Sequence, residues 1–341
     1  MAEPIDRTRG TTIAAIAREA GVSVPTVSKV LNGRTDVAAG TRARVEDVAS
    51  RQGYQRRRSV RRIGPRLIDL VVHGLHSGWA TEIIRGVEEV AGQQRAAVVL
   101  SDLGSAHRVQ REWFDDLLAR NPVGLILVLA ELDNEQRSVL QARGTPFVVV
   151  DTAGEPPDGV PVVGSTNWAG GLAATRHLVG LGHRRVAVIT GPRDMMCSRA
   201  RVDGYRNALD EAGIDIDPDF VRYGDFYIKG GYEHGYDLLS RPDRPTAVFA
   251  GSDLQALGVM RAARDLGLTV PGDLSVVGYD DVPVAAWITP ALTTVRQPLH
   301  DMARTAAQMV FDLADGDRSG NRRIDLATEL IVRESTAGPA S

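Results

Sequence analysis

The first part of the chain, residues 11–53, predicts three short amphipathic helices. Apolar side chains recur there at helical spacing, and the helices are expected at residues 12–20, 23–32 and 41–53. Gly21 ends the first helix because glycine readily adopts the backbone angles of a tight turn. Ser23 can cap the second helix, and Pro25 stands in its first turn, where the missing N–H costs little. Thr41 is the expected cap of the third helix, and such a module has room for one small core.

Beyond residue 66 the pattern changes to short apolar runs that alternate with stretches of helical length. Buried strands are expected at 67–72, 96–100, 124–130 and 147–150, and in a second set at 186–190, 246–250 and 274–278. Helices are expected near 80–93, 108–120, 134–143, 168–181, 198–212, 230–240 and 254–266. The C-terminal part adds a strand at 292–295, a helix at about 299–314 and one continuous strand at 324–332. This alternation predicts two doubly wound α/β lobes in tandem.

The connector between the two patterns indicates how the domains divide. Its sequence is RRRSVRRIGPR, a charged stretch that ends in a Gly-Pro breaker. We therefore expect a helical head at 1–55, a linker at 56–66 and a core at 67–341. The first lobe is expected at about 67–163 and 296–320, and the second lobe at about 164–290 and 324–335. Since ligands bind beyond the carboxyl ends of strands in open α/β sheets, two facing lobes predict a cleft between them.

Charge is distributed unevenly along the 341 residues. Residues 1–66 carry a balance of +8 and the rest of the chain −11, although the total is only −3. Clustered positive charge on a small segment is typical of a polyanion partner, with nucleic acid first among candidates. A solvated basic tail is the alternative that charge alone leaves open.

Composition excludes several classes of protein. A single cysteine, Cys197, cannot form an internal disulfide or a zinc thiolate cluster, and no signal peptide or membrane-spanning stretch is evident. We expect a cytoplasmic protein with no membrane partner. Phosphate-loop, dinucleotide, zinc-protease and nucleophile-elbow motifs are absent, and the seven histidines lack metal-ligand spacing. The sequence thus predicts that the protein is not an enzyme and that it binds no cofactor and no metal ion.

Residues 12–32, TIAAIAREAGVSVPTVSKVLN, strongly resemble the helix-turn-helix of the lactose-repressor (LacI) family, whose pattern is T-x-x-x-x-A-x-x-A-G-V-S-x-x-T-V-S-x-x-L-N. Further blocks resemble that family in the same order, at 183–189, 201–205, 253–258, 276–281 and 292–295. The resemblance implies a dimeric bacterial transcriptional regulator. It also implies a multidomain fold, with a small all-α helix-turn-helix head and a two-lobed α/β core of the type I periplasmic-binding-protein kind.

In a helix-turn-helix, the N-terminal residues of the second helix contact base edges in the major groove. Here these residues are Val24, Pro25 and Lys29. Lys29 can donate to guanine N7 and O6, whereas the other two offer only apolar contact, for instance to a thymine methyl group. Short polar residues near helix ends are candidates for phosphate contact, with helix capping as the alternative. They are Thr12, Ser23, Thr26, Ser28 and Asn32.

The linker departs from the family, whose usual hinge reads Y-x-P-N-x-x-A-x-x-L. The Pro-Asn pair is missing, and Val60 and Ile63 occupy the Ala and Leu positions. We expect Ile63 to insert into the minor groove, because an apolar wedge flanked by arginines is typical of minor-groove binding. The arginines expected to clamp nearby phosphates are Arg57, Arg61 and Arg62. A disordered basic linker is the alternative.

Six residues are candidates for contact with a small effector. The resemblance places Arg201 and Asp253 at family positions that reach the ligand, and Phe226 at a stacking aromatic. Each has a structural alternative: ion pairing for Arg201, helix capping for Asp253 and core packing for Phe226. Asp151 follows a predicted strand at its carboxyl end, where sites are built. Two tryptophans resemble cleft-wall positions, although a dimer surface would show the same pattern: Trp79 and Trp168.

These observations predict a repressor that binds a pseudo-palindromic operator as a homodimer and is controlled by a small effector. A sugar or oligosaccharide derived from a plant polysaccharide is the hypothesis for the effector. The alternative is a corepressor-dependent regulator that senses a purine-like or other metabolite, because linkage works with either sign. Two rivals are a soluble sugar-binding receptor, which would need an export signal, and an α/β enzyme with a nucleic-acid-binding tail.

The hinge interpretation predicts that Ile63→Ala weakens operator binding strongly without unfolding the protein, because it removes only the inserted side chain. A gel-shift titration measures the affinity, and circular dichroism checks the fold. Unchanged affinity would remove Ile63 from the mechanism.

Overall fold

The computed structural model describes residues 13–31, 37–52, 66–72, 74–75, 77–104, 109–152, 154, 159–317 and 323–340. Contacts divide the chain into two units, one with Met1–Pro65 and Asn134–Thr145, the other with Arg66–Asp133 and Pro146–Ser341. Six predicted DNA contacts lie outside the described residues: Thr12, Asn32, Arg57, Arg61, Arg62 and Ile63. In the described part of the chain, no helix is long and apolar enough to span a membrane.

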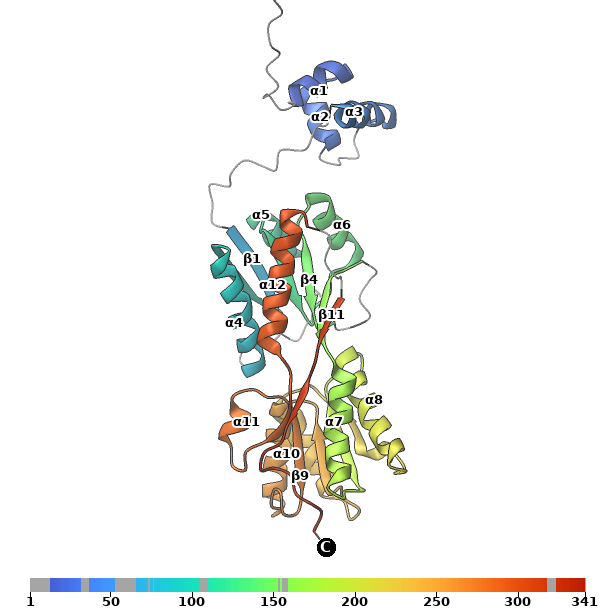
Figure 1. The fold of residues 1–341 in the computed structure, drawn as a ribbon, viewed down its shortest axis with the longest axis vertical. Coiled ribbons are helices and arrows are strands. Elements are labelled where there is room, and N and C mark those ends of the chain that lie inside the picture. The colour runs from blue at the N-terminus through green and yellow to red at the C-terminus, as the bar shows by residue number, and fades with distance from the viewer. Residues whose placement is uncertain are drawn as a thin grey trace, which may run out of the picture. The chain divides into compact units, whose positions relative to one another are not determined.

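The head consists of three helices around a small core, as predicted (Figure 1). They are α1 (Ile13–Ala20), α2 (Val24–Leu31) and α3 (Ala39–Arg51). Ile16, Val27 and Val45 are fully buried at the centre, one from each helix. The predicted cap of α2 is confirmed, because the amide of Thr26 donates to the hydroxyl of Ser23 at 3.3 Å. The predicted Thr41 cap was wrong, since α3 begins two residues earlier with no side-chain cap.

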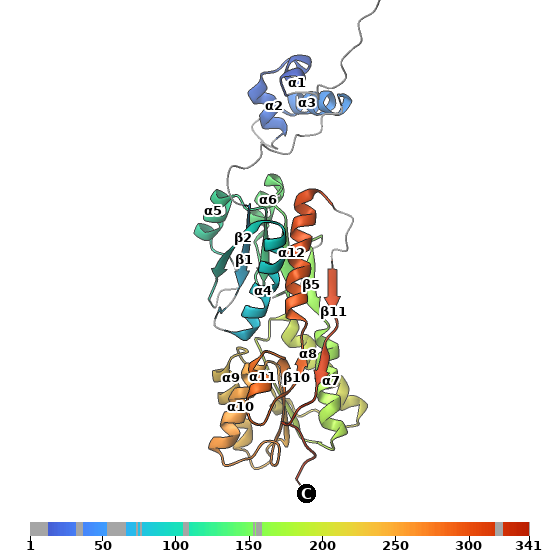
Figure 2. The same ribbon diagram turned by 60° about the vertical axis from the view of Figure 1, so that its left-hand side comes forward.

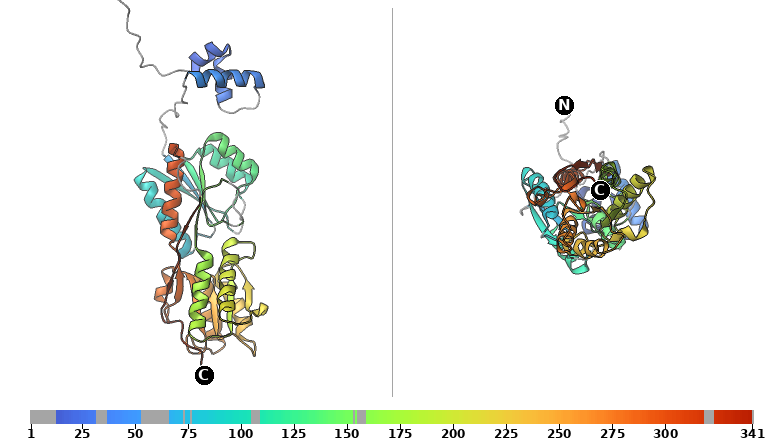
Figure 3. Two further views of the ribbon diagram at one scale, coloured as in Figure 1. Left: turned by 45° about the vertical axis from the view of Figure 1, so that its right-hand side comes forward. Right: turned by 90° about the horizontal axis from the view of Figure 1, so that it is seen from below.

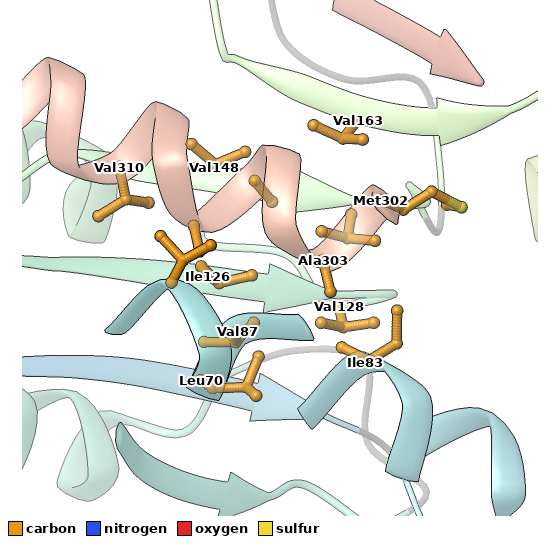
Figure 4. Close-up of a cluster of buried hydrophobic side chains, with 14 of the residues drawn as sticks. Leu70, Ile83, Val87, Ile126, Val128, Val148, Val163, Met302, Ala303 and Val310 are labelled. Atoms are coloured by element: carbon orange, nitrogen blue, oxygen red, sulfur yellow. The ribbon is translucent and has the colours of Figure 1, made fainter. Parts of the chain in front are cut away.

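The first lobe is built on a six-stranded parallel sheet of order β11-β5-β4-β3-β1-β2. Its strands are β1 (Arg66–Val72), β2 (Ala96–Asp102), β3 (Gly124–Val128), β4 (Phe147–Val150), β5 (Val162–Ser165) and β11 (Arg323–Leu326). Helices α4 (Gly78–Gln93) and α12 (Leu299–Asp315) cover one face, where Val87 and Met302 pack with Leu70 and Ile126 (Figure 4). The remaining helices of this stretch of chain are α5 (Arg111–Arg120) and α6 (Asn134–Arg143).

The second lobe repeats the plan, with strand order β12-β10-β9-β8-β6-β7. Its strands are β6 (Val186–Thr190), β7 (Val221–Tyr223), β8 (Ala247–Ala250), β9 (Ser275–Asp280), β10 (Thr293–Arg296) and β12 (Glu329–Ile331), of which only β12 is antiparallel. Its helices are α7 (Asn167–Gly180), α8 (Met196–Glu211), α9 (Ile228–Leu239), α10 (Asp253–Asp265) and the short α11 (Val284–Trp287), beside the 3-10 turn Pro218–Phe220. The α7–α8 and α9–α10 pairs supply two separate core clusters.

Two glycines bring α7 and α8 unusually close together, and the helices lie side by side as the yellow-green and yellow ribbons of Figure 3. A Cβ atom on Gly171 would collide with the backbone carbonyl of Arg201, and one on Gly204 would collide with that of Trp168. Glycine is therefore required at both positions. The contact fixes the backbone at two of the candidate effector-binding residues.

Three short connections join the lobes, at residue 166, at 297–298 and at 327–328 (Figures 1 and 2). At the third connection, the prediction of one continuous strand at 324–332 that belongs to the second lobe was wrong. Arg323–Leu326 pairs with β5 of the first sheet, and Glu329–Ile331 pairs with β10 of the second. At the break, the amide of Thr328 donates to the hydroxyl of Thr166 at 3.0 Å. Apolar alternation indicates which face of a strand is buried, but not which sheet the strand joins.

Candidate functional site

A cavity of about 250 Å³ lies between the two lobes. Several lining residues follow the carboxyl ends of strands, which is where open α/β sheets build ligand sites. They are Leu129 after β3, Asp151 after β4, Pro192 after β6, Phe226 after β7 and Ser252 after β8, with Asp280 closing β9. Four predicted effector contacts line this cavity: Trp79, Asp151, Arg201 and Phe226.

Arg201 is the central charged group of the cavity. Its side chain is 3% exposed, with Nε donating to Asn167 Oδ1 at 2.9 Å and Nη1 to the carbonyl of Gly251 at 2.5 Å. The guanidinium carbon lies 3.8 Å from the ring centre of Tyr279 and 5.4 Å from that of Phe226. Among the described residues, no carboxylate lies within ion-pair distance of Arg201, so the predicted alternative of ion pairing does not account for it. Its remaining N–H groups can donate to a ligand.

Asp280 is an essential part of the cavity wall that the sequence analysis missed. Its carboxylate accepts a hydrogen bond from Gln297 Nε2 at 2.6 Å, and the Oε1 atom of Gln297 accepts one from Ser165 Oγ at 2.7 Å. This chain of hydrogen bonds joins β5 of the first lobe, the second connection and β9 of the second lobe. The same rule that selected Asp151, a carboxylate at the end of a buried strand, would have found Asp280.

Burial perturbs both carboxyl groups. Loss of solvation raises the pKa of Asp280 to about 7, against the opposing effects of the Arg201 charge and the Gln297 hydrogen bond. Loss of solvation also raises the pKa of Asp151 to about 6, while the Arg201 charge lowers it. The cavity therefore holds two carboxyl groups that can accept or donate hydrogen bonds near neutral pH.

Asp253 requires a correction. It does not line the cavity, because its fully buried carboxylate accepts from the amide of Val282 at 2.8 Å and from Thr294 Oγ1 at 2.5 Å. Capping of α10 does not explain it either, since Ser252 caps that helix by accepting from the amide of Gln255 at 3.0 Å. Asp253 instead ties the start of α10 to β10 and to the loop after β9.

Trp168 lines a different cavity from the one that holds Trp79. This second cavity, of about 340 Å³, also includes Asp151 and Cys197, which line both. Cys197 is buried, and loss of solvation raises the pKa of its thiol to about 11, so it is a poor nucleophile. In the described part of the chain, no group of His, Cys, Asp and Glu residues is arranged to hold a metal ion.

The second helix of the head has two distinct faces. Val27 and Val30 are buried, whereas Val24 is 46% exposed and Pro25 and Lys29 are also exposed. The three predicted base-contacting residues thus share the solvent face of α2. The predicted phosphate contacts Ser23 and Thr26 hydrogen-bond to each other through their hydroxyls at 2.8 Å, and Ser28 lies on the same helix, partly exposed.

Comparisons with known proteins agree with this arrangement. Residues 12–57 match the family of bacterial regulatory proteins of the lacI type, and residues 175–336 match a periplasmic binding protein-like domain. The repressor CytR of Escherichia coli K12 is 33% identical over 326 residues, 94% of this chain and 95% of that protein. A complex of the transcriptional regulator CelR with cellobiose superposes with a TM-score of 0.71 at 34% identity, covering 95% and 99% of the two chains. The lac repressor dimer bound to operator and an anti-inducer superposes with a TM-score of 0.69 at 28% identity, covering 96% of this chain and 100% of that chain.

The head, the two-lobed core and these relatives define an effector-controlled transcriptional regulator. The chain belongs to the LacI family. It is a DNA-binding repressor under the control of an effector, and not an enzyme.

The raised pKa of Asp280 predicts how stability depends on pH. Between about pH 4 and 7 the folded core holds a proton that the unfolded chain releases, so this carboxyl group lowers the free energy of unfolding as pH rises. In Asp280→Asn the amide oxygen still accepts from Gln297, but this dependence is lost. The variant is therefore expected to gain stability relative to the parent from pH 4 to pH 8, by at most on the order of 4 kcal/mol.

Urea unfolding followed by circular dichroism at several pH values measures this difference. Asp225→Asn serves as the control because Asp225 is an exposed carboxylate of the same cavity. A difference between Asp280→Asn and the parent that does not change with pH would contradict the prediction.

Proposed function

We propose that this chain is a homodimeric repressor of the bacterial cytoplasm whose operator binding is controlled by a sugar in the cavity between its lobes. One observation carries the proposal: the cavity combines aromatic surfaces with a buried guanidinium and buried carboxyl groups, contributed by both lobes. Sugars need flat apolar surfaces together with paired hydrogen-bonding groups. The similarity to the cellobiose complex of CelR supports the same class of ligand.

We propose a role in sugar binding for each of these groups. Trp79 and Phe226 offer ring faces for the C–H groups of a pyranose, and Arg201 donates to its hydroxyl oxygens. Asp151 and Asp280 accept from hydroxyls when ionised and can donate when protonated. Arg201 is held by Asn167 and Gly251 before any ligand arrives, so little of its side-chain entropy is lost on binding.

Control of operator binding follows from the position of the cavity. A sugar held by both lobes binds one arrangement of the lobes better than another, and the three connections allow the lobes to move. Such a ligand shifts the population of the DNA-binding state by its differential affinity, typically about 1–3 kcal/mol. Operator titrations with and without sugar measure whether the sugar weakens or strengthens operator binding.

The head supports sequence-specific recognition of duplex DNA. Two copies of α2 in a homodimer would read two half-sites, so we propose a pseudo-palindromic operator. Lys29 provides the main direct readout through guanine, with Val24 and Pro25 in apolar contact. Phosphate contacts by Ser23, Thr26 and Ser28, and insertion of Ile63, belong to the same proposal.

The first prediction from this proposal concerns Arg201. Arg201→Lys keeps the positive charge but loses the planar fork, and we expect sugar affinity to fall by about 10- to 100-fold, the equivalent of one or two charged hydrogen bonds. Calorimetry against a panel of sugars and nucleobases measures the affinity. Circular dichroism checks that the variant keeps the parent fold.

Arg206→Lys is the matched control, because Arg206 lies on the same helix, is exposed and pairs with Asp203 at 3.3 Å. Tight binding of a nucleobase, with no response to any sugar, would overturn the proposed ligand class. Unchanged sugar affinity in Arg201→Lys would overturn the assignment of the cavity.

The second prediction concerns Lys29. Lys29→Ala is expected to cost about 1–3 kcal/mol of operator affinity and to relax the preference at one guanine in each half-site. Binding to a library of half-site variants measures both effects. An equal loss on every sequence would show that Lys29 contacts only phosphate.

A further inference from the structure

The second cavity lies beside the effector cavity. Asp151 and Cys197 line both cavities, and the second is lined by both lobes. From the first lobe come Ser165 at the end of β5 and Asp325 on β11, and from the second come the first turns of α7 and α8. A molecule bound there would therefore touch Thr166, one of the three connections between the lobes, together with the two elements that it joins, β5 and α7.

Trp168 gives this cavity a large aromatic surface. Its side chain is 45% exposed, although it belongs to the second residue of a well-formed helix. Its Nε1 donates to Asn207 Oδ1 on α8 at 3.5 Å, and its backbone carbonyl lies against Gly204. The ring is thus presented by two tightly packed helices rather than by a loop, which is the arrangement expected of a pre-formed binding surface.

Polar groups surround that aromatic surface. Arg323 and Asp325 form an ion pair at 3.0 Å on one side, and Thr152 and Thr166 contribute hydroxyls. Thr166 is already held by Thr328, with 3.0 Å between the two hydroxyl oxygens. An exposed ring face among hydroxyls, an ion pair and the Asp151 carboxyl group suits a ligand that is itself uncharged, flat on one side and rich in hydroxyls.

We propose that the cavity around Trp168 is a second pyranose-binding subsite. This inference rests on the proposed function, since it assigns the same class of ligand to both cavities. The ring bound there is either the second unit of a disaccharide effector or a separate sugar molecule. In both cases its apolar face covers Trp168, and its hydroxyls bond to Thr166 and to the other polar groups that line the cavity.

Calorimetry with paired probes tests the subsite: glucose with cellobiose, and xylose with xylobiose. We expect at least one disaccharide to bind the full chain one-to-one and about tenfold or more tighter than its monosaccharide. Trp168→Ala should remove that advantage and leave monosaccharide affinity within twofold, whereas Trp168→Phe should restore much of it. Trp287→Ala is the control, because Trp287 is 86% exposed on α11 and lines neither cavity.

The stoichiometry distinguishes the two sources of the ring. Two monosaccharides per chain, reduced to one by Trp168→Ala, support a separate molecule in the subsite. Sugar binding that Trp168→Ala leaves unchanged in affinity and stoichiometry would overturn the subsite while the proposed function stands. Loss of sugar binding in Trp168→Ala together with a change in oligomeric state, measured by light scattering, would also overturn the subsite. Failure of every sugar to bind the parent would overturn the proposed function itself.

Discussion

The cleft depends on one buried guanidinium. A charge that is taken out of water must be compensated locally, and Arg201 has no carboxylate within ion-pair distance among the described residues. Its compensation comes from an amide oxygen, a backbone carbonyl, two aromatic rings, and the charges of Asp280 and Asp151 when these groups are ionised. Since Asn167 is the first residue after a connection between the lobes, the geometry of the ligand site and that of the connection are linked. A change in one alters the hydrogen bonds of the other.

The other two connections between the lobes are also held by hydrogen bonds. Gln297 joins Asp280 to Ser165, and Thr328 joins its own connection to Thr166. The groups available to a ligand are therefore in direct hydrogen-bonded contact with the segments about which the lobes would turn. Such an arrangement converts small shifts at the site into larger displacements, because packed elements switch between discrete states rather than deform continuously.

Much of the fold and part of the site could be predicted from the sequence. Helical periodicity gave the three helices of the head, and buried apolar runs gave most strands of both lobes. The strands β5 and β7 escaped because each has only three or four residues and carries little pattern. For the site, the rule of strand ends selected Asp151 and the resemblance selected Trp79, Arg201 and Phe226, all of which line the cavity, and their contact with an effector stays a prediction. Asp253 was assigned to the ligand by the resemblance alone, whereas its neighbour Ser252 lines the cavity, because a family motif does not show which way a side chain points.

The division of the last strand between two sheets has a consequence for biosynthesis. Each lobe is assembled from segments far apart in the gene, and the first sheet lacks both its edge strand and the helix α12 until nearly the whole chain has been translated. The helical head can fold as soon as it emerges from the ribosome, whereas the apolar face containing Ile126 and Val148 waits for residues synthesised more than 150 positions later. The nascent chain thus completes its helical head long before its two-lobed core. During this interval the apolar surface of the incomplete core is exposed, and the chain most needs protection from aggregation.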